Sequence, residues 1–299
     1  MKKKPIRTLL SAILVCTALL TACGKGSPGD KVQKVEGLEG YGNIAVITRE
    51  EGSGTREVFA ERLGLIDKKD SNRRDLITAD GKIEMNSEGI MEAVKNDKTA
   101  VGYVSLGALP QTLDGIKVIK VENIEASGQT VQDGSYPLSR EFVLAYSGEL
   151  SDAEHDFLTY VMSEGQDIVS ESYTSVKPAA AFLSDQSKGR IEIAGSTSVT
   201  PLMERLSRQY MLLNRNVEME IKPSDSTSGL TAAMQGSCDL GMSSRELKDY
   251  EKELLNYRTI AKDGVAVVVN EDNPVESLTR KQLADIFNGT DTVWNDINK

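Results

Sequence analysis

The chain has 299 residues, with 45 acidic against 35 basic side chains and a formal net charge of −10. This acidic balance disfavours nucleic acid as a partner, and one histidine with three cysteines disfavours a metal site of nitrogen and sulfur ligands. The length suits one large or two smaller globular units with a sizeable core.

Residues 1–22 have the pattern of a secretory signal peptide. Basic side chains precede an apolar stretch from Leu9 to Ala22, and this stretch is shorter than the about 20 apolar residues that span a bilayer. The segment ends in Leu20, Thr21, Ala22 and Cys23, which resembles the lipobox of bacterial lipoproteins. The resemblance implies that Cys23 is the first mature residue, carries the diacylglyceryl and palmitate groups, and holds the protein on the extracytoplasmic face of the cell membrane. An ordinary secretory signal with an incidental cysteine is the alternative.

The segment that follows the signal, residues 23–41, is predicted to be a flexible tether because it begins with glycines, a serine and a proline. Cys16 leaves with the signal peptide and Cys23 carries the lipid, so Cys238 remains alone and cannot form a disulfide within the mature chain. We interpret Cys238 as a small buried apolar residue and expect no cofactor and no metal.

From residue 44 onward, short apolar strands alternate with helix-like segments, which predicts an α/β architecture with sheets covered by helices. Leu202, Leu206 and Tyr210 recur at helical spacing after Pro201, which suits the first turn of a helix. The stretch from Pro178 to Arg190 is predicted to be a linker. The expected strands are Ile44–Ile47, Val101–Val104, Val118–Val121, Phe142–Tyr146, Ile191–Ala194, Val217–Ile221 and Val265–Val269.

Small clusters of glycine, serine and threonine stand at four expected strand-to-helix turns. A helix N-terminus exposes unpaired N–H groups and the positive end of its dipole, so such clusters suit an anion. Arg49 lies four residues before Ser53 and would add the fork of donors that tetrahedral oxyanions favour. Any one cluster could be a simple helix cap or turn. The clusters are Gly52–Thr55, Gly195–Ser198, Ser226–Gly229 and Ser243–Ser244.

Several of these segments, in combination, resemble the phosphate-binding proteins of phosphate ABC transporters, the PstS family. Arg49–Arg56 is similar to the family's arginine loop, and Ala194–Pro201 is similar to its first anion loop. The resemblance covers residues from about 42 to 299. Further matching segments are Val101–Val104, Tyr136–Arg140, Ser226–Gly229, Asp239–Leu247 and Ile286–Trp294.

The resemblance implies a set of phosphate-binding residues. Glu51 stands where the family places a carboxylate that braces the arginine. Ser244 stands where the best-known members have an aspartate that accepts the proton of hydrogen phosphate; a hydroxyl can accept that proton but does not repel sulfate. Sulfate or molybdate is therefore an alternative ligand. The implied phosphate-binding residues are Arg49, Ser53, Gly54, Thr55, Thr197, Ser198, Ser226 and Ser244.

The implied fold is a two-lobed clamp of the type II periplasmic-binding-protein kind, with the ligand between the lobes. The two halves stand in swapped order here, so the chain resembles a circularly permuted member. Mapped onto the family plan, residues 116–267 form lobe I, with the linker 178–190 joining the original ends, and residues 42–115 plus 268–299 form lobe II. This plan predicts that Gly42 and Lys299 lie near each other on lobe II. A truncated tandem fusion is the alternative.

The implied function is capture of inorganic phosphate by a monomeric lipoprotein that delivers it to the membrane permease subunits of an ABC importer. A phosphate-sensing lipoprotein is an alternative. A serine hydrolase using Ser53 or Ser198 would need a base. The one histidine, His155, lies in an acidic helix-like segment, and neither serine stands in a Gly-x-Ser-x-Gly motif, so we expect a protein that is not an enzyme.

Overall fold

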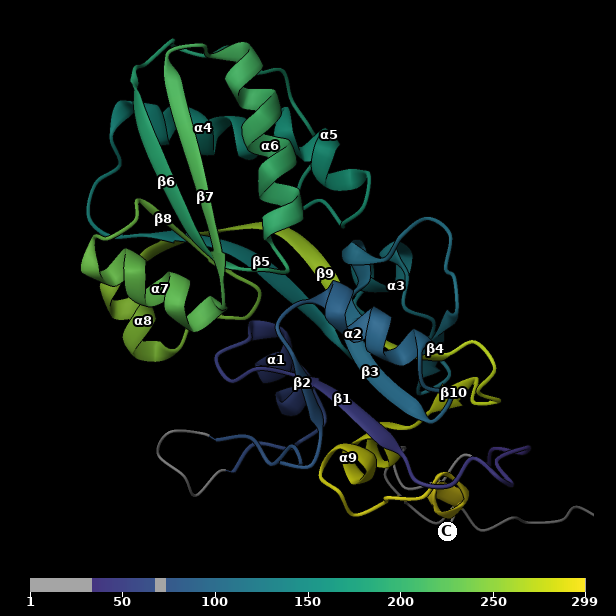
Figure 1. The fold of residues 1–299 in the computed structure, drawn as a ribbon. Coiled ribbons are helices and arrows are strands. Elements are labelled where there is room, and N and C mark those ends of the chain that lie inside the picture. Colours follow the sequence, from purple (N-terminus) through teal and green to yellow (C-terminus); the bar gives the residue numbers. More distant parts are fainter. Residues whose placement is uncertain (1–33, 68–73, 299) are drawn as a thin grey trace, which may run out of the picture.

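The computed structural model describes residues 34–67 and 74–298 (Figure 1). The predicted signal peptide, Cys23 and the first part of the predicted tether lie outside these residues. Within the described ranges, no helix is long and apolar enough to cross a bilayer. Nor do three or more histidine, cysteine or acidic side chains of these ranges gather as a metal site would require.

One continuous path of paired strands, in the order β2-β1-β3-β9-β5-β8-β6-β7, runs through the whole molecule, with β4 beside β9 and β10 beside β4. The strand β9 pairs with β3 and β4 along its C-terminal half and with β5 along its N-terminal half. Figure 1 shows β5 and β9 running diagonally from the upper lobe to the lower one. The strands are β1 (Ala45–Arg49), β2 (Lys82–Glu84), β3 (Ala100–Ser105), β4 (Ile116–Val121), β5 (Ser139–Tyr146), β6 (Gly189–Ser196), β7 (Val217–Ser224), β8 (Leu240–Ser243), β9 (Asn256–Asn270) and β10 (Ser277–Leu278).

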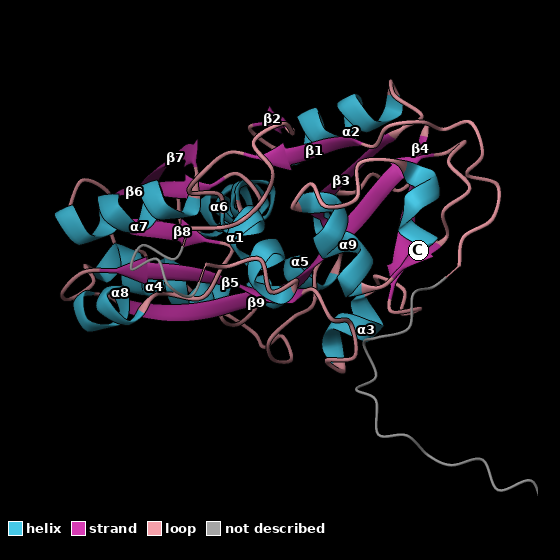
Figure 2. Cartoon of the chain, turned by 90° about the horizontal axis from the view of Figure 1, so that it is seen from below, coloured by secondary structure: helices cyan, strands magenta, loops and turns pink. Residues whose placement is uncertain are grey.

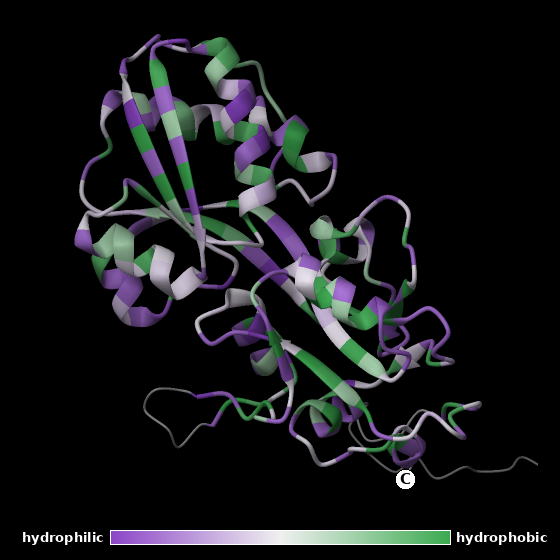
Figure 3. Ribbon diagram, viewed as in Figure 1, coloured by the Kyte–Doolittle hydropathy of each residue, from purple (hydrophilic) through white to green (hydrophobic). Residues whose placement is uncertain are grey.

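The helices cover these strands on both lobes, as expected for an α/β protein. The helix predicted after Pro201 is α6, which has that proline in its first turn. Each predicted strand is present, and Figure 3 shows the alternation of apolar and polar residues along β6 and β7. The helices are α1 (Gly54–Arg62), α2 (Ser87–Lys95), α3 (Gly128–Gln132), α4 (Asp152–Val161), α5 (Gly165–Ser170), α6 (Thr200–Leu213), α7 (Ser226–Gln235), α8 (Asp249–Leu254) and α9 (Arg280–Phe287), with 3-10 turns η1 (Leu106–Ala108) and η2 (Trp294–Asn298).

Separate hydrophobic cores define two lobes, which lie side by side in Figure 2. The lobe II core includes Ile116 and Leu138 and resumes at Val265, whereas the lobe I cores begin at Phe142 and end at Ala261. The predicted boundary at 116 is therefore wrong, because β4 pairs with β9 and β10 and packs in lobe II. The predicted boundary at 268 is wrong by a few residues, because Val265, Ala266 and Val267 belong to the lobe II core. Below, lobe II means residues 34–138 with 264–298, and lobe I means residues 139–263.

Both ends of the described chain lie on lobe II. Trp294 N donates to Gly42 O at 3.0 Å, and Val35 exchanges two hydrogen bonds of 2.7 Å with the Asn298 side chain. The predicted proximity of the two ends therefore holds as far as Asn298, beyond which Lys299 lies outside the described residues. The predicted tether is wrong for residues 34–41, because Leu38 is 1% exposed within the lobe II core.

The predicted linker forms neither helix nor strand until β6 begins at Gly189. It is fixed to lobe I by the buried carboxylate of Asp156, which accepts hydrogen bonds from Ser184 Oγ at 2.6 Å, Asp185 N at 3.1 Å and Tyr210 Oη at 2.7 Å. The ring of Phe182 packs against the rings of Tyr160 and Tyr210. The linker is thus part of the packing of lobe I.

We expect Asp156→Ala to lower the free energy of unfolding by about 3 kcal/mol, because a buried acceptor of three hydrogen bonds is lost. A urea titration followed by circular dichroism measures this change. The matched control is His155→Ala, since His155 is exposed on the same helix; it should shift the free energy by less than about 0.5 kcal/mol. Equal losses for the two variants would contradict the anchoring role of Asp156.

Candidate functional site

A polar cluster lies where the two lobes meet, at the N-terminal ends of three helices. Ser53 caps α1 by accepting a hydrogen bond from Arg56 N, Asp225 caps α7, and the loop of Thr197 and Ser198 leads into α6. The first N–H groups of a helix have no partner within the helix, so these helix ends can supply donors to an anion at the seam between the lobes. The fourth cluster, Ser243–Ser244, differs from the prediction because a loop separates the end of β8 from α8.

The predicted site residues of the two lobes converge in this cluster. Arg49 Nη2 donates to Thr197 Oγ1 at 3.0 Å, and Thr55 Oγ1 lies 2.8 Å from Ser198 Oγ. A Cβ atom on Gly54 would lie 2.4 Å from Ser226 Oγ and 2.6 Å from Ser244 Oγ, so the backbone at Gly54 passes directly over lobe I. Glycine is required at this close approach.

Serine hydroxyls connect the lobe I side of the cluster. Ser196 donates to Ser244 Oγ at 3.0 Å, Ser226 Oγ lies 3.3 Å from Ser244 Oγ, and Ser244 N donates to Ser226 Oγ at 3.1 Å. The side chains of Thr55, Ser226 and Ser244 are fully buried, and Arg49 is 2% exposed. An anion held here would lose its water, so the protein donors must replace its hydration.

The guanidinium of Arg49 is braced on lobe II. Its Nε and Nη2 form a bidentate pair with Glu50 at 2.8 and 2.7 Å, and the carbonyl oxygens of Glu84 and Met85 accept further hydrogen bonds. The predicted brace, Glu51, is wrong: Glu51 lies exposed in the turn after β1, while Glu50 folds back over the guanidinium. Nη1 has no hydrogen-bond partner within the described residues, which leaves it available for a ligand.

Tyr103 supports the backbone at the start of the arginine loop. Its hydroxyl accepts a hydrogen bond from Arg49 N at 3.2 Å and lies 2.7 Å from Thr48 Oγ1. Burial raises the pKa of Tyr103 to about 12, so the phenol stays protonated at neutral pH. Its ring stacks on Phe59 with the centroids 4.0 Å apart, which ties the end of β1 to α1.

A second buried arginine, Arg140, reaches the cluster and was not among the predicted site residues. Arg140 Nη1 donates to Thr55 Oγ1 at 2.6 Å, while Nε and Nη2 donate to Asp263 Oδ2 at 2.9 and 2.6 Å. Burial lowers the pKa of Arg140, and the charge of Asp263 opposes this shift. Sequence reasoning missed this residue because its carboxylate partner follows 123 positions later, on another strand.

The lobes also meet beside the cluster, at the rim of the seam. Arg245 Nε of lobe I lies 2.8 Å from a carboxylate oxygen of Glu57 in α1. Thr227 Oγ1 donates to Gly52 O at 3.3 Å. Together with the contacts at Arg49 and Thr55, these interactions describe two lobes in direct contact, with the polar cluster enclosed between them.

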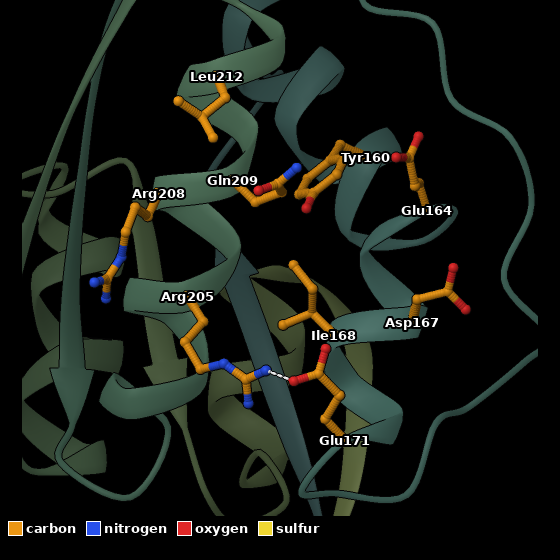
Figure 4. A pocket seen from close by; sticks show the side chains of 9 residues that line it. All are labelled: Tyr160, Glu164, Asp167, Ile168, Glu171, Arg205, Arg208, Gln209 and Leu212. Atoms are coloured by element: carbon orange, nitrogen blue, oxygen red, sulfur yellow. Dashed lines mark hydrogen bonds and ion pairs between the residues drawn. The ribbon is translucent and has the colours of Figure 1, made fainter.

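The hydrolase alternative finds no support in this geometry. His155 is exposed on α4, and Figure 1 places α4 far from α1. Ser198 instead lies against Thr55. The residues that line a separate hollow between α5 and α6 include no histidine (Figure 4), and Arg205 and Glu171 form an ion pair across it.

Comparison with known proteins places this geometry in a family. A model described as PBP superfamily domain matches residues 34–165 and 180–299. A protein of Streptococcus agalactiae serotype V, named Phosphate-binding protein PstS 2, is 37% identical over 305 aligned residues, which span 100% of both chains. The chain belongs to the PstS family of phosphate-binding proteins. Its fold is thereby that of the periplasmic-binding-protein superfamily.

Two further PstS-family relatives show how the similarity is distributed. The crystal structure of a phosphate ABC transporter's phosphate-binding protein from Streptococcus pneumoniae is 37% identical, with a TM-score of 0.72, and the match covers 86% of this chain and 100% of that one. The protein named Phosphate-binding protein PstS of Staphylococcus saprophyticus is 33% identical over 123 residues, or 38% of this chain. The similarity to the streptococcal proteins therefore extends through both lobes.

We expect Gly54→Ala to prevent full closure of the lobes, because the added Cβ would overlap the hydroxyls of Ser226 and Ser244. The distance between spin labels at Glu88 in lobe II and Asp152 in lobe I, both exposed, measures the closure. Gly128→Ala is the matched control, since the nearest atom to its Cβ would be 4.0 Å away. A wild-type distance distribution in Gly54→Ala would contradict the close approach.

Proposed function

We propose that this protein captures inorganic phosphate outside the cytoplasmic membrane and delivers it to the permease subunits of an ABC importer. The observation that carries the proposal is the enclosed cluster in which Arg49 and Thr55 of lobe II converge with the threonine and serines of lobe I. The names of the streptococcal relatives, which are phosphate-binding proteins, support phosphate as the ligand.

The chemistry of the cluster suits a tetrahedral oxyanion. Arg49 supplies a fork of donors, the ends of α1 and α7 supply backbone N–H groups, and the hydroxyls of Thr55, Thr197 and Ser198 supply more. A bound ligand would accept hydrogen bonds from donors of both lobes at once. We therefore expect the ligand to favour the closed arrangement of the lobes. A closed, loaded protein then differs in shape from an open one, which is the difference a permease can recognise.

Sulfate or molybdate is the second candidate ligand, and one observation favours it. Three carboxylates beside the cluster are committed to protein partners: Glu50 pairs with Arg49, Asp263 pairs with Arg140, and Asp225 accepts hydrogen bonds from Ser228. The hydroxyl of Ser244, at the position of the family's aspartate, carries no charge that would repel a fully ionised anion.

Two further proposals concern how the protein is attached to the membrane and the order of its two halves along the chain. Lipid modification of Cys23 would hold the protein at the membrane. We further expect the protein to be a monomer and to have no enzymatic activity. Circular permutation is supported by the adjacent chain ends on lobe II and by the linker packed on lobe I. The restriction of the staphylococcal match to 38% of this chain is also consistent with a changed order of the halves.

We expect Arg49→Ala to weaken phosphate binding at least about tenfold, or about 1.4 kcal/mol, because the variant loses the guanidinium that faces Thr197 across the seam. Isothermal titration calorimetry of the protein without residues 1–22 measures the affinity. Arg62→Ala, which removes an exposed arginine at the other end of α1, is the control and should bind as the wild type does.

The same titration with sulfate separates the two candidate ligands. Phosphate binding that sulfate does not displace at neutral pH supports the proposed function. Tighter binding of sulfate would assign the site to the second candidate, and unchanged phosphate affinity in Arg49→Ala would remove the cluster as the site.

A further inference from the structure

Arg140 and Asp263 face each other on the two strands that connect the lobes, near the start of β5 and in the middle of β9. Arg140 lies on β5 and Asp263 on β9, and the two residues are directly paired in the antiparallel register. On one side of this pair, Leu138 and Val265 belong to the lobe II core; on the other, Phe142 and Ala261 belong to lobe I. The ion pair therefore sits at the crossing between the lobes.

The pair also touches lobe II at two places away from its own strands. Arg140 Nη1 donates to Thr55 Oγ1 at 2.6 Å, at the start of α1. Asp263 accepts hydrogen bonds from Ser105 Oγ at 2.8 Å and Gly107 N at 3.1 Å, at the end of β3. Arg140 is 4% and Asp263 2% exposed, so these contacts are shielded from competing water.

The contact with Thr55 restricts the direction of a hydroxyl proton. A threonine hydroxyl has one proton to donate and lone pairs to accept with. An arginine N–H only donates, so Thr55 Oγ1 must act as the acceptor toward Arg140. The proton of Thr55 then points to the other side of the oxygen, where Ser198 Oγ lies 2.8 Å away across the seam.

We propose that Arg140 is a positioning residue of the anion site: held by Asp263, it fixes the Thr55 hydroxyl as a hydrogen-bond donor toward the ligand. The inference rests on the proposed function and deepens it. Arg140 acts through Thr55 and not through its charge, because its carboxylate partner neutralises the guanidinium at 2.6 Å. In the closed arrangement the protein holds this donor toward the anion, so the ligand does not have to order it.

The position of the pair gives this arrangement a second consequence. Because Arg140 and Asp263 lie on the strands that cross between the lobes, a change in the angle between the lobes shifts the guanidinium relative to Thr55. The donor is therefore aligned in the closed arrangement, where the ligand is enclosed, and is less well aligned when the strands bend open. The angle between the lobes, set by β5 and β9, would in this way affect the affinity of the anion site.

A double-mutant cycle on phosphate affinity tests the inference, with Arg140→Lys and Thr55→Val as its two arms. Lysine keeps the charge beside Asp263 but lacks the fork that spans Asp263 and Thr55, and valine keeps the shape of threonine without its hydroxyl. We expect Arg140→Lys to weaken binding about tenfold in the wild-type chain and less than about twofold in the Thr55→Val chain. The Thr55→Ser chain, which keeps a hydroxyl, should restore the full tenfold effect.

Thermal unfolding of each variant verifies that it is folded. If Arg140→Lys does not fold, Asp263→Asn takes its place in the cycle, because it loosens the anchor of Arg140 while leaving the donor in place. Arg205→Met, an arginine paired with Glu171 far from the cluster, should bind as the wild type does. Equal losses with and without the Thr55 hydroxyl would overturn the inference alone. A wild-type protein that binds no phosphate would overturn the proposed function and this inference with it.

Discussion

Polar groups of both lobes lose contact with water where the lobes meet, and the hydrogen bonds across that seam are the interactions on which the rest of the structure depends. Arg49 reaches Thr197, and Thr55 reaches Ser198, each pair joining segments more than 140 positions apart. Buried donors are costly when they lack acceptors. In the described structure the hydroxyls of the cluster pair with one another. An oxyanion between the lobes would offer the same donors charged acceptors.

The scaffold supplies these donors by geometry that the chain can build locally. The ends of β1, β6 and β7 each lead within a few residues to a helix N-terminus, so three helix ends face the same seam. Tyr103 and Glu50 then fix the arginine loop, and Gly54 lets its backbone approach Ser226 and Ser244. The crossing strands β5 and β9 carry the buried pair of Arg140 and Asp263 to this cluster. The crossing strands and the polar cluster are thereby one connected hydrogen-bond network.

Local patterns in the sequence predicted the parts of the molecule that local forces determine. Apolar runs located β1, β3, β4, β6 and β7, and helical spacing located α6, because those segments bury one side against a core. The N-terminal half of β9 was missed, since Lys262 and Asp263 interrupt its apolar pattern. The pairing of Arg140 with Asp263 depends on strand register, which a single sequence does not contain. The lobe boundary was misplaced for the same reason: β4 belongs to lobe II through its pairing with β9. The choice between Glu50 and Glu51 depends on the shape of one turn.

The most direct test of a single enclosed oxyanion site is a crystal structure of the mature protein grown with phosphate. We expect one anion between the lobes, in contact with Arg49 and Thr55 from lobe II and with Ser198 and Ser226 from lobe I. Phosphate bound elsewhere, or lobes closed on the cluster with no anion between these residues, would contradict it.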